Sequence, residues 1–325
     1  SVTANFRIEP DVQGAFSWSG TTLTFRPDQA LTPGSEYTVF LEPGAVSAEG
    51  RAVLGEHRYQ FTVMPPRVAY LYPGNDFPHN VWIVDPADPN NSQQITESPD
   101  GIQDFSVSPD GTQIAFTENN RLTGGSDLKL INLDSGALQQ LTNCQQAMCS
   151  KPVWRPDGRM IAYERIEYDE QFGNSPSRIW LIDLSTTPAT TRPLFQETQI
   201  LGYDAQWSAD GNRIALVDRG TVAILVYDFT TQQLISIASQ AGSSGALSPD
   251  GTRLIYPDLV FLPNGPVNKQ RLALLDSGEL STITAEDETT NDQRVQWSPD
   301  GTQLAIAREN GEGIQIVLYD LQTGE

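Results

Sequence analysis

The sequence predicts an all-β protein in two parts, a β-sandwich at the N-terminus followed by a six-bladed β-propeller. Two observations carry this prediction. Residues 1–64 contain short runs that alternate polar and apolar residues between Pro and Gly turns, a pattern typical of antiparallel sandwiches. Beyond them one turn motif recurs five times at intervals of 40–53 residues, a period that indicates four-stranded propeller blades.

The N-terminal segment has four alternating runs, which we expect to be strands, at residues 15–18, 22–27, 31–41 and 59–63. The second run has the pattern TLTFxP and is followed by LxPGxxYTVxL and a closing FTV. In these motifs residues 1–64 resemble the bacterial Ig-like domains of surface and envelope proteins. Domains of that family usually begin with further strands, so we expect a sandwich that is incomplete at its N-terminus.

The boundary between the two parts is predicted at Met64-Pro65-Pro66. Paired prolines give a stiff, extended connector without hydrogen-bond donors for a sheet. We therefore expect domains at residues 1–64 and 67–325.

The repeated turn has the form Ser-Pro-Asp-Gly, with Arg replacing Ser in the second copy and Ala replacing Pro in the third. Pro presets the backbone for the second turn position, and Gly takes the left-handed conformation that a hairpin turn requires. The five copies occupy residues 108–111, 155–158, 208–211, 248–251 and 298–301. Each is therefore expected to join the first two strands of one blade.

Apolar strands are predicted on both sides of each turn. The strand before it ends in pairs such as Val153-Trp154, and the strand after it is a continuous apolar run such as Ile161-Ala162-Tyr163, which suits a strand covered on both faces. A third strand and a more polar fourth strand follow in each unit. The first blade, with strands at 68–70, 81–85 and 94–96, lacks an innermost strand, and the last blade stops at Glu325 before a fourth. We expect the natural chain to continue beyond Glu325.

Turn, strand pattern and spacing together resemble the TolB-type propeller repeat over residues 67–325. The resemblance implies an extracytoplasmic, six-bladed propeller that binds other proteins or peptides, and it does not imply one particular ligand. If the chain did end at Glu325, unpaired strand edges would be exposed, and assembly through strands donated by another chain would be an alternative.

The charge balance restricts the classes of partner. The formal net charge is −21, which repels phosphate backbones and anionic lipid, so we expect no nucleic-acid partner. The charge favours solubility, with a cationic ligand or partner as the alternative. No apolar stretch is long enough to span a bilayer, so no direct membrane insertion is expected. No cofactor is predicted.

The two cysteines, Cys144 and Cys149, are predicted to form a disulfide that closes a small loop, which would place the protein in an oxidising compartment. Two free thiols are the alternative. A zinc site is not expected, because His57 and His79 are the only histidines.

A binding face is predicted where the long loops gather, opposite the short Asp-Gly turns. The long loops are 73–79, 118–126, 164–177, 257–270, the Cys144–Cys149 loop and 285–292. The candidate anchors on this face are the aromatic residues Phe77, Tyr168, Phe172 and Phe261. The alternative for each is local packing under its own loop.

Other conspicuous residues are given structural roles. Trp154, Trp207 and Trp297 occupy equivalent repeat positions and are expected to pack between blades rather than to line a channel. The turn aspartates are explained by turn chemistry. The acidic stretch 285–292 could bind Ca²⁺ but lacks the ligand spacing of a dedicated loop, so a solvated acidic loop is favoured.

No catalytic constellation is evident. A Gly-x-Ser-x-Gly elbow is missing, and two histidines in different parts of the chain make a Ser-His-Asp set improbable. The predicted function is non-catalytic binding or scaffolding through propeller loops, within a bacterial envelope or surface assembly. The alternative is the accessory propeller of a larger hydrolase, prolyl-oligopeptidase-like or glycosidase-like, whose catalytic part lies outside this chain.

Overall fold

The computed structural model describes residues 2–19, 22–46, 50–74, 77–197, 199–284 and 290–324. Over these ranges the secondary structure consists of β-strands and one 3₁₀ turn, η1 (Thr3–Asn5). The predicted all-β class is confirmed. The chain divides into two compact units, Ser1–Tyr70 with Trp82–Gln93 and Leu71–Val81 with Gln94–Glu325, which we describe separately.

The N-terminal residues form two small antiparallel sheets. One contains β1 (Phe6–Glu9), β4 (Glu36–Leu41) and β5 (His57–Thr62), and the other contains β2 (Gly14–Ser19) and β3 (Thr22–Pro27). The sheets meet at three rings, since the Phe6 ring of β1 lies 5.0 Å from that of Phe16 and 5.2 Å from that of Phe25. Strands β2 to β5 match the four runs predicted from the sequence. The four residues of β1 were not predicted.

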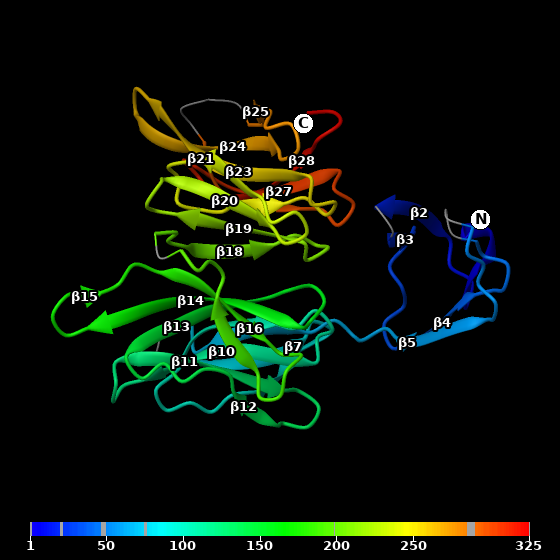
Figure 1. The fold of residues 1–325 in the computed structure, drawn as a ribbon, viewed down its shortest axis with the longest axis horizontal. Helices are drawn as coiled ribbons and strands as arrows, with labels where there is room; N and C mark the ends of the chain where they lie inside the picture. The colour runs from blue at the N-terminus through cyan, green and yellow to red at the C-terminus, as the bar shows by residue number, and fades with distance from the viewer. Residues whose placement is uncertain are drawn as a thin grey trace. The chain divides into compact units, whose positions relative to one another are not determined.

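Beyond the N-terminal sheets, the described strands form six successive antiparallel groups, which we number as sheets (Figure 1). One parallel bridge, between Ser126 and Met148, joins the second group to the third in a single nine-stranded sheet. The first contains β6 (Val68–Tyr72), β7 (Asn80–Asp85) and β8 (Asp88–Gln94). The second contains β9 (Ile102–Val107), β10 (Gln113–Asn120), β11 (Gly125–Asn132) and β12 (Leu138–Gln140). The third contains β13 (Ala147–Trp154), β14 (Met160–Asp169), β16 (Arg178–Asp183) and β17 (Thr190–Pro193), with the short β15 (Gly173–Asn174) beside β14.

The last three sheets follow the same order. The fourth contains β18 (Tyr203–Trp207), β19 (Arg213–Asp218), β20 (Ala223–Asp228) and β21 (Leu234–Ala238). The fifth contains β22 (Ala246–Leu247), β23 (Arg253–Leu262), β24 (Gly265–Leu274) and β25 (Leu280–Thr282). The sixth contains β26 (Asn291–Trp297), β27 (Gln303–Asn310) and β28 (Gly313–Asp320). We call the first strand of the second to sixth sheets the inner strand.

One predicted strand is displaced. The run Gln94-Ile95-Thr96 was expected to be the last strand of the first sheet, but that strand, β8, covers Asp88–Gln94. Thr96 instead accepts a hydrogen bond from the backbone N–H of Val81 through its hydroxyl group (2.9 Å). The polar composition of β8, which is exposed along its whole length, explains why its hydropathy did not identify it as a strand.

The Asp-Gly turns are held by a repeated set of side-chain hydrogen bonds. At residues 108–113 the Ser108 hydroxyl donates to Asp110 Oδ1 (2.6 Å) and accepts from the Gln113 backbone N–H (2.9 Å). Asp110 Oδ1 also accepts from the Thr112 N–H (3.1 Å). The bond from Ser108 lowers the pKa of the Asp110 carboxyl, because it stabilises the ionised form. These bonds fix the reversal between the first two strands of a sheet.

Apolar cores lie between consecutive sheets. Ile161 of β14 belongs to a cluster with Leu128 of β11, whereas the next residue, Ala162, packs with Ile214 and Leu216 of β19. Successive side chains of a strand point to opposite faces, so the unbroken apolar run of β14 serves two cores. This is the arrangement predicted from the sequence.

Tryptophan side chains tie inner strands to the preceding sheet. The indole N–H of Trp154 donates to the carbonyl of Ser106 (3.1 Å), that of Trp207 to Val153 (3.2 Å) and that of Trp297 to Ala246 (2.8 Å). Each bond joins two consecutive inner strands. The three tryptophans therefore contribute to contacts between sheets, in line with the role expected for them.

Arginines beside the turns bond to the following sheet, whereas the tryptophans bond to the preceding one. Arg155 Nε donates to the carbonyl of Gly211 (2.9 Å) and Arg253 Nη2 to that of Gly301 (3.2 Å), in each case in the turn of the following sheet. The Arg253 guanidinium also lies 4.6 Å from the centre of the Trp297 ring. Consecutive sheets are thus linked by directional bonds in addition to apolar packing.

The first prediction concerns the indole bonds. Trp207→Phe keeps an aromatic ring but removes the donor to Val153. We therefore expect the free energy of unfolding to fall by about 1–2 kcal/mol. Trp180→Phe is the control, since no described residue accepts a hydrogen bond from its indole. Urea denaturation measures both variants, and equal losses would contradict the assignment.

The second prediction concerns Gly245, which precedes β22 and has φ +73°. A Cβ there would lie 2.8 Å from Tyr256 Cα, so Gly245→Ala adds a backbone clash to left-handed strain. We expect a loss of about 3 kcal/mol or more in unfolding free energy. Gly278→Ala is the control, because φ is +72° there and no atom lies within 4 Å of the added Cβ, which leaves a cost of about 1 kcal/mol. Similar losses in thermal or urea unfolding would show that the clash is relieved.

Candidate functional site

The long connections of the predicted binding face are largely β-hairpins rather than loops. Residues 118–126, 164–177 and 257–270 were expected to be loops, but β10 and β11, β14 and β15, and β23 and β24 extend into them. The longest extension pairs Pro257 with Gln270 and continues in register to Leu262 and Gly265. The backbone groups bond across the hairpin, which gives these segments a defined shape.

Three of the four candidate anchors lie on these hairpins. Tyr168 and Phe172 are on β14 and the turn after it, with 56% and 85% of their surface exposed, and Phe261 near the tip of β23 is 72% exposed. The backbone N–H of Phe172 donates to Asp169 Oδ1 (2.9 Å), which orders the turn. Figure 1 shows the β14–β15 and β23–β24 hairpins projecting on the same side of the sheets.

Phe77 differs from the other three candidates. It is half exposed, but its ring lies edge-on to His79 at 5.4 Å and faces the Arg121 guanidinium at 5.5 Å. A Cβ on Gly101 would clash with the Phe77 ring, so the ring packs directly against that backbone. Local packing, the alternative weighed for each aromatic, accounts for part of the Phe77 surface.

The predicted disulfide between Cys144 and Cys149 is confirmed. Both cysteines are buried in the core between the second and third sheets, with Leu128, Leu141 and Trp154. Disulfides persist in oxidising compartments, so this bond indicates a location outside the cytoplasm.

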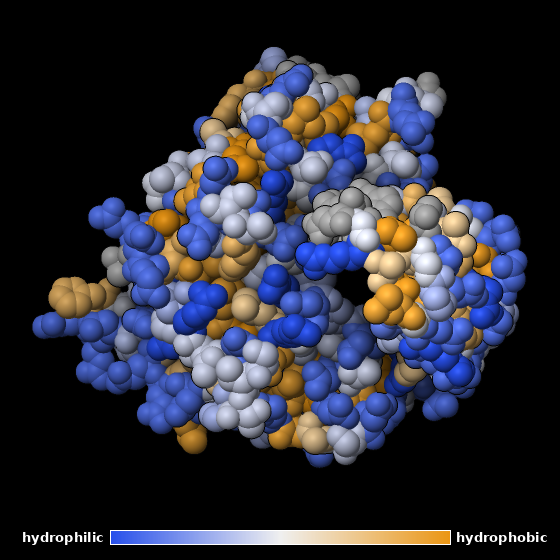
Figure 2. Space-filling model, turned by 45° about the vertical axis from the view of Figure 1, so that its right-hand side comes forward, coloured by the Kyte–Doolittle hydropathy of each residue, from blue (hydrophilic) through white to orange (hydrophobic). Residues whose placement is uncertain are grey.

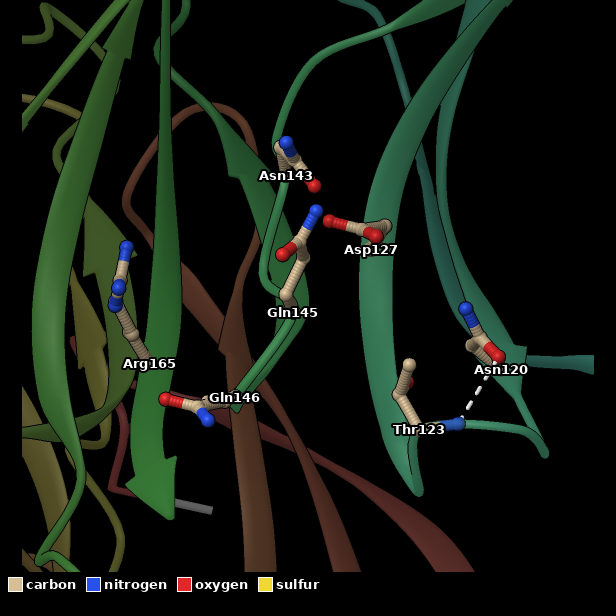
Figure 3. A pocket seen from close by; sticks show the side chains of 7 residues that line it. All are labelled: Asn120, Thr123, Asp127, Asn143, Gln145, Gln146 and Arg165. Atoms are coloured by element: carbon tan, nitrogen blue, oxygen red, sulfur yellow. Dashed lines mark hydrogen bonds between the residues drawn. The ribbon is translucent and has the colours of Figure 1, made fainter. Parts of the chain in front are cut away.

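A polar cavity of about 830 Å³ lies beside the disulfide loop (Figure 3). Its lining is rich in amides and consists of Asn120, Thr123, Asp127, Asn143, Gln145, Gln146 and Arg165. The two charged residues in this lining are already bonded to other groups of the protein. Asp127 Oδ1 accepts from the Thr142 hydroxyl (2.8 Å) and the Cys144 N–H (2.7 Å). Arg165 forms an ion pair with Glu167 at 3.3 Å and lies 4.6 Å from the centre of the Trp180 ring.

A second group of polar residues occupies one repeat position, which lies on the inner strand in four sheets and just before it in the fifth. Four residues before each Asp-Gly turn the chain carries Asp104, Lys151, Asp204, Ser244 and Arg294. We call these the inner-strand set. Because these residues differ in charge, the repeat is not visible as a motif, and they were not identified in the sequence analysis. Counting back from the five turns would have aligned them.

Hydrogen bonds link the inner-strand set from one sheet to the next. They involve four members of the set and one residue outside it, Glu164 of β14. The backbone N–H of Lys151 donates to Asp104 Oδ1 (3.1 Å), and that of Ser244 donates to Asp204 Oδ2 (2.8 Å). The Asp204 N–H donates to Oε1 of Glu164 in β14 (2.9 Å). Each donor therefore binds a carboxylate of the preceding sheet.

Local backbone geometry makes these bonds available. Lys151 and Asp204 have φ of 53° and 56°, and each lies where the inner strand shifts register against its neighbour. A bulge leaves its backbone groups unpaired in the ladder, so they can bond elsewhere. Left-handed geometry costs a non-glycine residue about 1–2 kcal/mol, and such strain is concentrated at functional sites.

Glu164 is the buried centre of this network. Only 5% of its surface is exposed, and its Oε1 also accepts from Lys151 Nζ (3.0 Å). The Ser177 hydroxyl donates to its Oε2 (3.4 Å). Burial raises the pKa of Asp104 above that of an ordinary aspartate, although hydrogen bonds from Thr117 and the Lys151 N–H act the other way.

Two cavities open over the network. The inner-strand cavity, about 350 Å³, is lined by Lys151, Tyr203, Asp204, Ser243, Pro257 and Arg294 among others. The hairpin cavity, about 590 Å³, is lined by Lys151, Glu164, the segment 174–177, Tyr203 and Arg219 among others. Lys151 and Tyr203 line both cavities, so the two adjoin. The exposed aromatics lie on the hairpins that supply residues 174–177 and Pro257.

Within the described ranges, no three His, Cys, Asp or Glu side chains are arranged to hold a metal ion. Most of the acidic stretch, residues 285–289, lies outside the described residues, so the solvated acidic loop stays a prediction, with Ca²⁺ binding as its alternative. The described helical segments include none that is long and apolar enough to cross a membrane. The face drawn in Figure 2 is mostly hydrophilic, with hydrophobic residues in separate groups.

Comparisons with known proteins support the two-part architecture. Residues 1–63 match the family model of the bacterial Ig-like domain. The solved structure of TolB from Acinetobacter baumannii has a TM-score of 0.53 and 17% identity, covering 98% of this chain and 78% of that chain. A structure from a study of two prolyl endopeptidases has a TM-score of 0.58 and 14% identity, covering 79% of this chain and 40% of that chain. At such identities the likeness concerns the fold.

One curated relative matches over a shorter stretch. Dipeptidyl-peptidase 5 of Porphyromonas gingivalis is 31% identical over 121 residues, which is 35% of this chain. The chain spans only 17% of the length of that protein. Together, the comparisons establish an Ig-like segment followed by a propeller-like fold similar to that of TolB and of peptidase propellers.

Proposed function

We propose that this protein is a non-catalytic binding module that recognises protein or peptide segments on the side of its propeller where the long hairpins project. The observation that carries the proposal is the position of Tyr168, Phe172 and Phe261. They are exposed on hairpins that also contribute walls to the inner-strand and hairpin cavities. Exposed aromatic anchors beside a concave polar site are typical of protein recognition.

We further propose the finer architecture expected from the sequence. The domains would be residues 1–64 and 67–325, and the six sheets would be the blades of one closed ring. Ile314, Ile316 and Leu318 on β28 are about two-thirds exposed. Contacts that close the ring would cover this apolar surface, which would otherwise be costly in water.

The location that fits this function is the periplasm or the cell surface, within an envelope assembly. The buried disulfide supports an oxidising compartment, and the Ig-like segment would act as a spacer or assembly contact.

A second candidate function is the propeller of a larger hydrolase. The match to dipeptidyl-peptidase 5 and the likeness to the prolyl endopeptidase structure favour it. In that case the cavities would select or admit a peptide substrate for a catalytic domain elsewhere. Protein from the native source would then release p-nitroaniline from dipeptidyl p-nitroanilides, whereas the binding proposal predicts no turnover.

The third prediction tests recognition through the hairpins. Peptides selected from a random phage-displayed library on residues 1–325 should bind the triple variant Tyr168→Ala, Phe172→Ala, Phe261→Ala at least tenfold more weakly in fluorescence polarisation. Truncation of central anchors typically costs this much or more.

The control removes three exposed apolar side chains from outer strands, as Leu138→Ala, Leu234→Ala, Leu280→Ala. We expect the control to bind like the wild type. Unchanged binding by the aromatic triple variant, or an equal loss in the control, would show that recognition takes place elsewhere.

A further inference from the structure

The two adjoining cavities concentrate positive charge in an acidic protein. The chain has 41 acidic and 20 basic residues, yet Lys151, Arg219 and Arg294 all line this space. The acidic residues in the same walls are Glu164 and Asp204. The local balance is therefore positive, opposite to that of the whole chain.

The two carboxylates are engaged by the protein itself. Glu164 accepts from Lys151 Nζ, the Asp204 N–H and the Ser177 hydroxyl. Asp204 Oδ2 accepts from both the N–H and the hydroxyl of Ser244, at 2.8 and 3.1 Å. Glu164 is bonded at both carboxylate oxygens and Asp204 at Oδ2, so each has less capacity to attract a cationic ligand. The cationic partner weighed from net charge alone is thus not favoured at this site.

The two arginines, by contrast, have donors to spare. Among the described residues, neither Arg219 nor Arg294 forms an ion pair, whereas Arg155, Arg213 and Arg253 at the turns all do. The Arg219 guanidinium lies 4.6 Å from the centre of the Tyr203 ring, which holds its plane at the cavity wall. A guanidinium presents paired N–H groups that match a carboxylate.

The extent of the joined cavities also suits a polypeptide. The joined cavities run from the β14–β15 hairpin to the inner strand β26, which is more room than a single small acid requires.

We infer that the joined cavities bind a carboxylate-bearing peptide segment, with Arg219 and Arg294 as its ligands and Lys151, held by Glu164, between them. This inference rests on the proposed peptide-binding function and names its ligand class. The carboxylate belongs either to an Asp or Glu side chain or to the C-terminus of the partner.

The experiment compares peptide selection on three proteins. A random dodecapeptide library is panned, once with free C-termini and once with the C-termini fused to the display protein. The targets are the wild type, the double variant Arg219→Gln, Arg294→Gln, and the control Arg159→Gln, Arg192→Gln. The control removes the same charge from two exposed arginines of the third sheet that line neither cavity.

The expected result is at least threefold enrichment of acidic residues, or a strict need for a free C-terminus, on the wild type and the control but not on the double variant. Peptides selected on the wild type should bind the double variant about tenfold more weakly in fluorescence polarisation. Acidic enrichment in both libraries assigns the carboxylate to a side chain, whereas binding only with free C-termini assigns it to the C-terminus.

The outcomes separate this inference from the proposed function. Peptides that bind through the exposed aromatics without any preference for a carboxylate would overturn the inference and leave the function standing. An equal loss in the control would attribute the effect to general charge and would also overturn it. Failure to select any binder would contradict both.

Discussion

The structure depends on how each inner strand is bonded to the sheet before it. Within a sheet the backbone groups satisfy one another, so neighbouring sheets share few directional bonds. Here those bonds recur at both ends of the inner strand. The indole N–H groups of Trp154 and Trp207 reach a preceding carbonyl, and three residues earlier in each strand a bulged backbone N–H reaches a preceding carboxylate. Apolar packing supplies most of the stabilisation, and these bonds fix the register of one sheet on the next.

The bulged end of each inner strand is also where the candidate site lies. The bonds that join the sheets engage the carboxylates of Glu164 and Asp204, whereas Arg219 and Arg294 form no ion pair with the described residues. The buried carboxylate of Glu164 holds the Lys151 ammonium in place, while Arg219 and Arg294 keep donors for a ligand. Field lines from fixed charges are focused in a cavity with low-dielectric walls, so this local charge can prevail over the net charge of the chain.

Much of the fold could be predicted from the sequence, because its signals are local. Pro, Asp and Gly predict the turn at 108–111 and the four later copies of that turn. The apolar run 161–163 predicts a strand covered on both faces. The extended hairpin at 257–270 was missed, since Pro257, Pro263 and Pro266 interrupt its apolar run and suggest a loop. The inner-strand set was missed for a different reason. Its members differ in charge, and the partner of Asp204, Glu164, is 40 residues away in another sheet.

Hydrogen–deuterium exchange of residues 1–325, with and without a saturating acidic peptide, tests the central claim most directly, because it locates the occupied surface. The account predicts slower exchange of backbone amides at 202–206, 219–220 and 293–296, and along the β14–β15 hairpin. Protection confined to residues 120–127 and 143–147, around the amide-lined cavity of Figure 3, would contradict it.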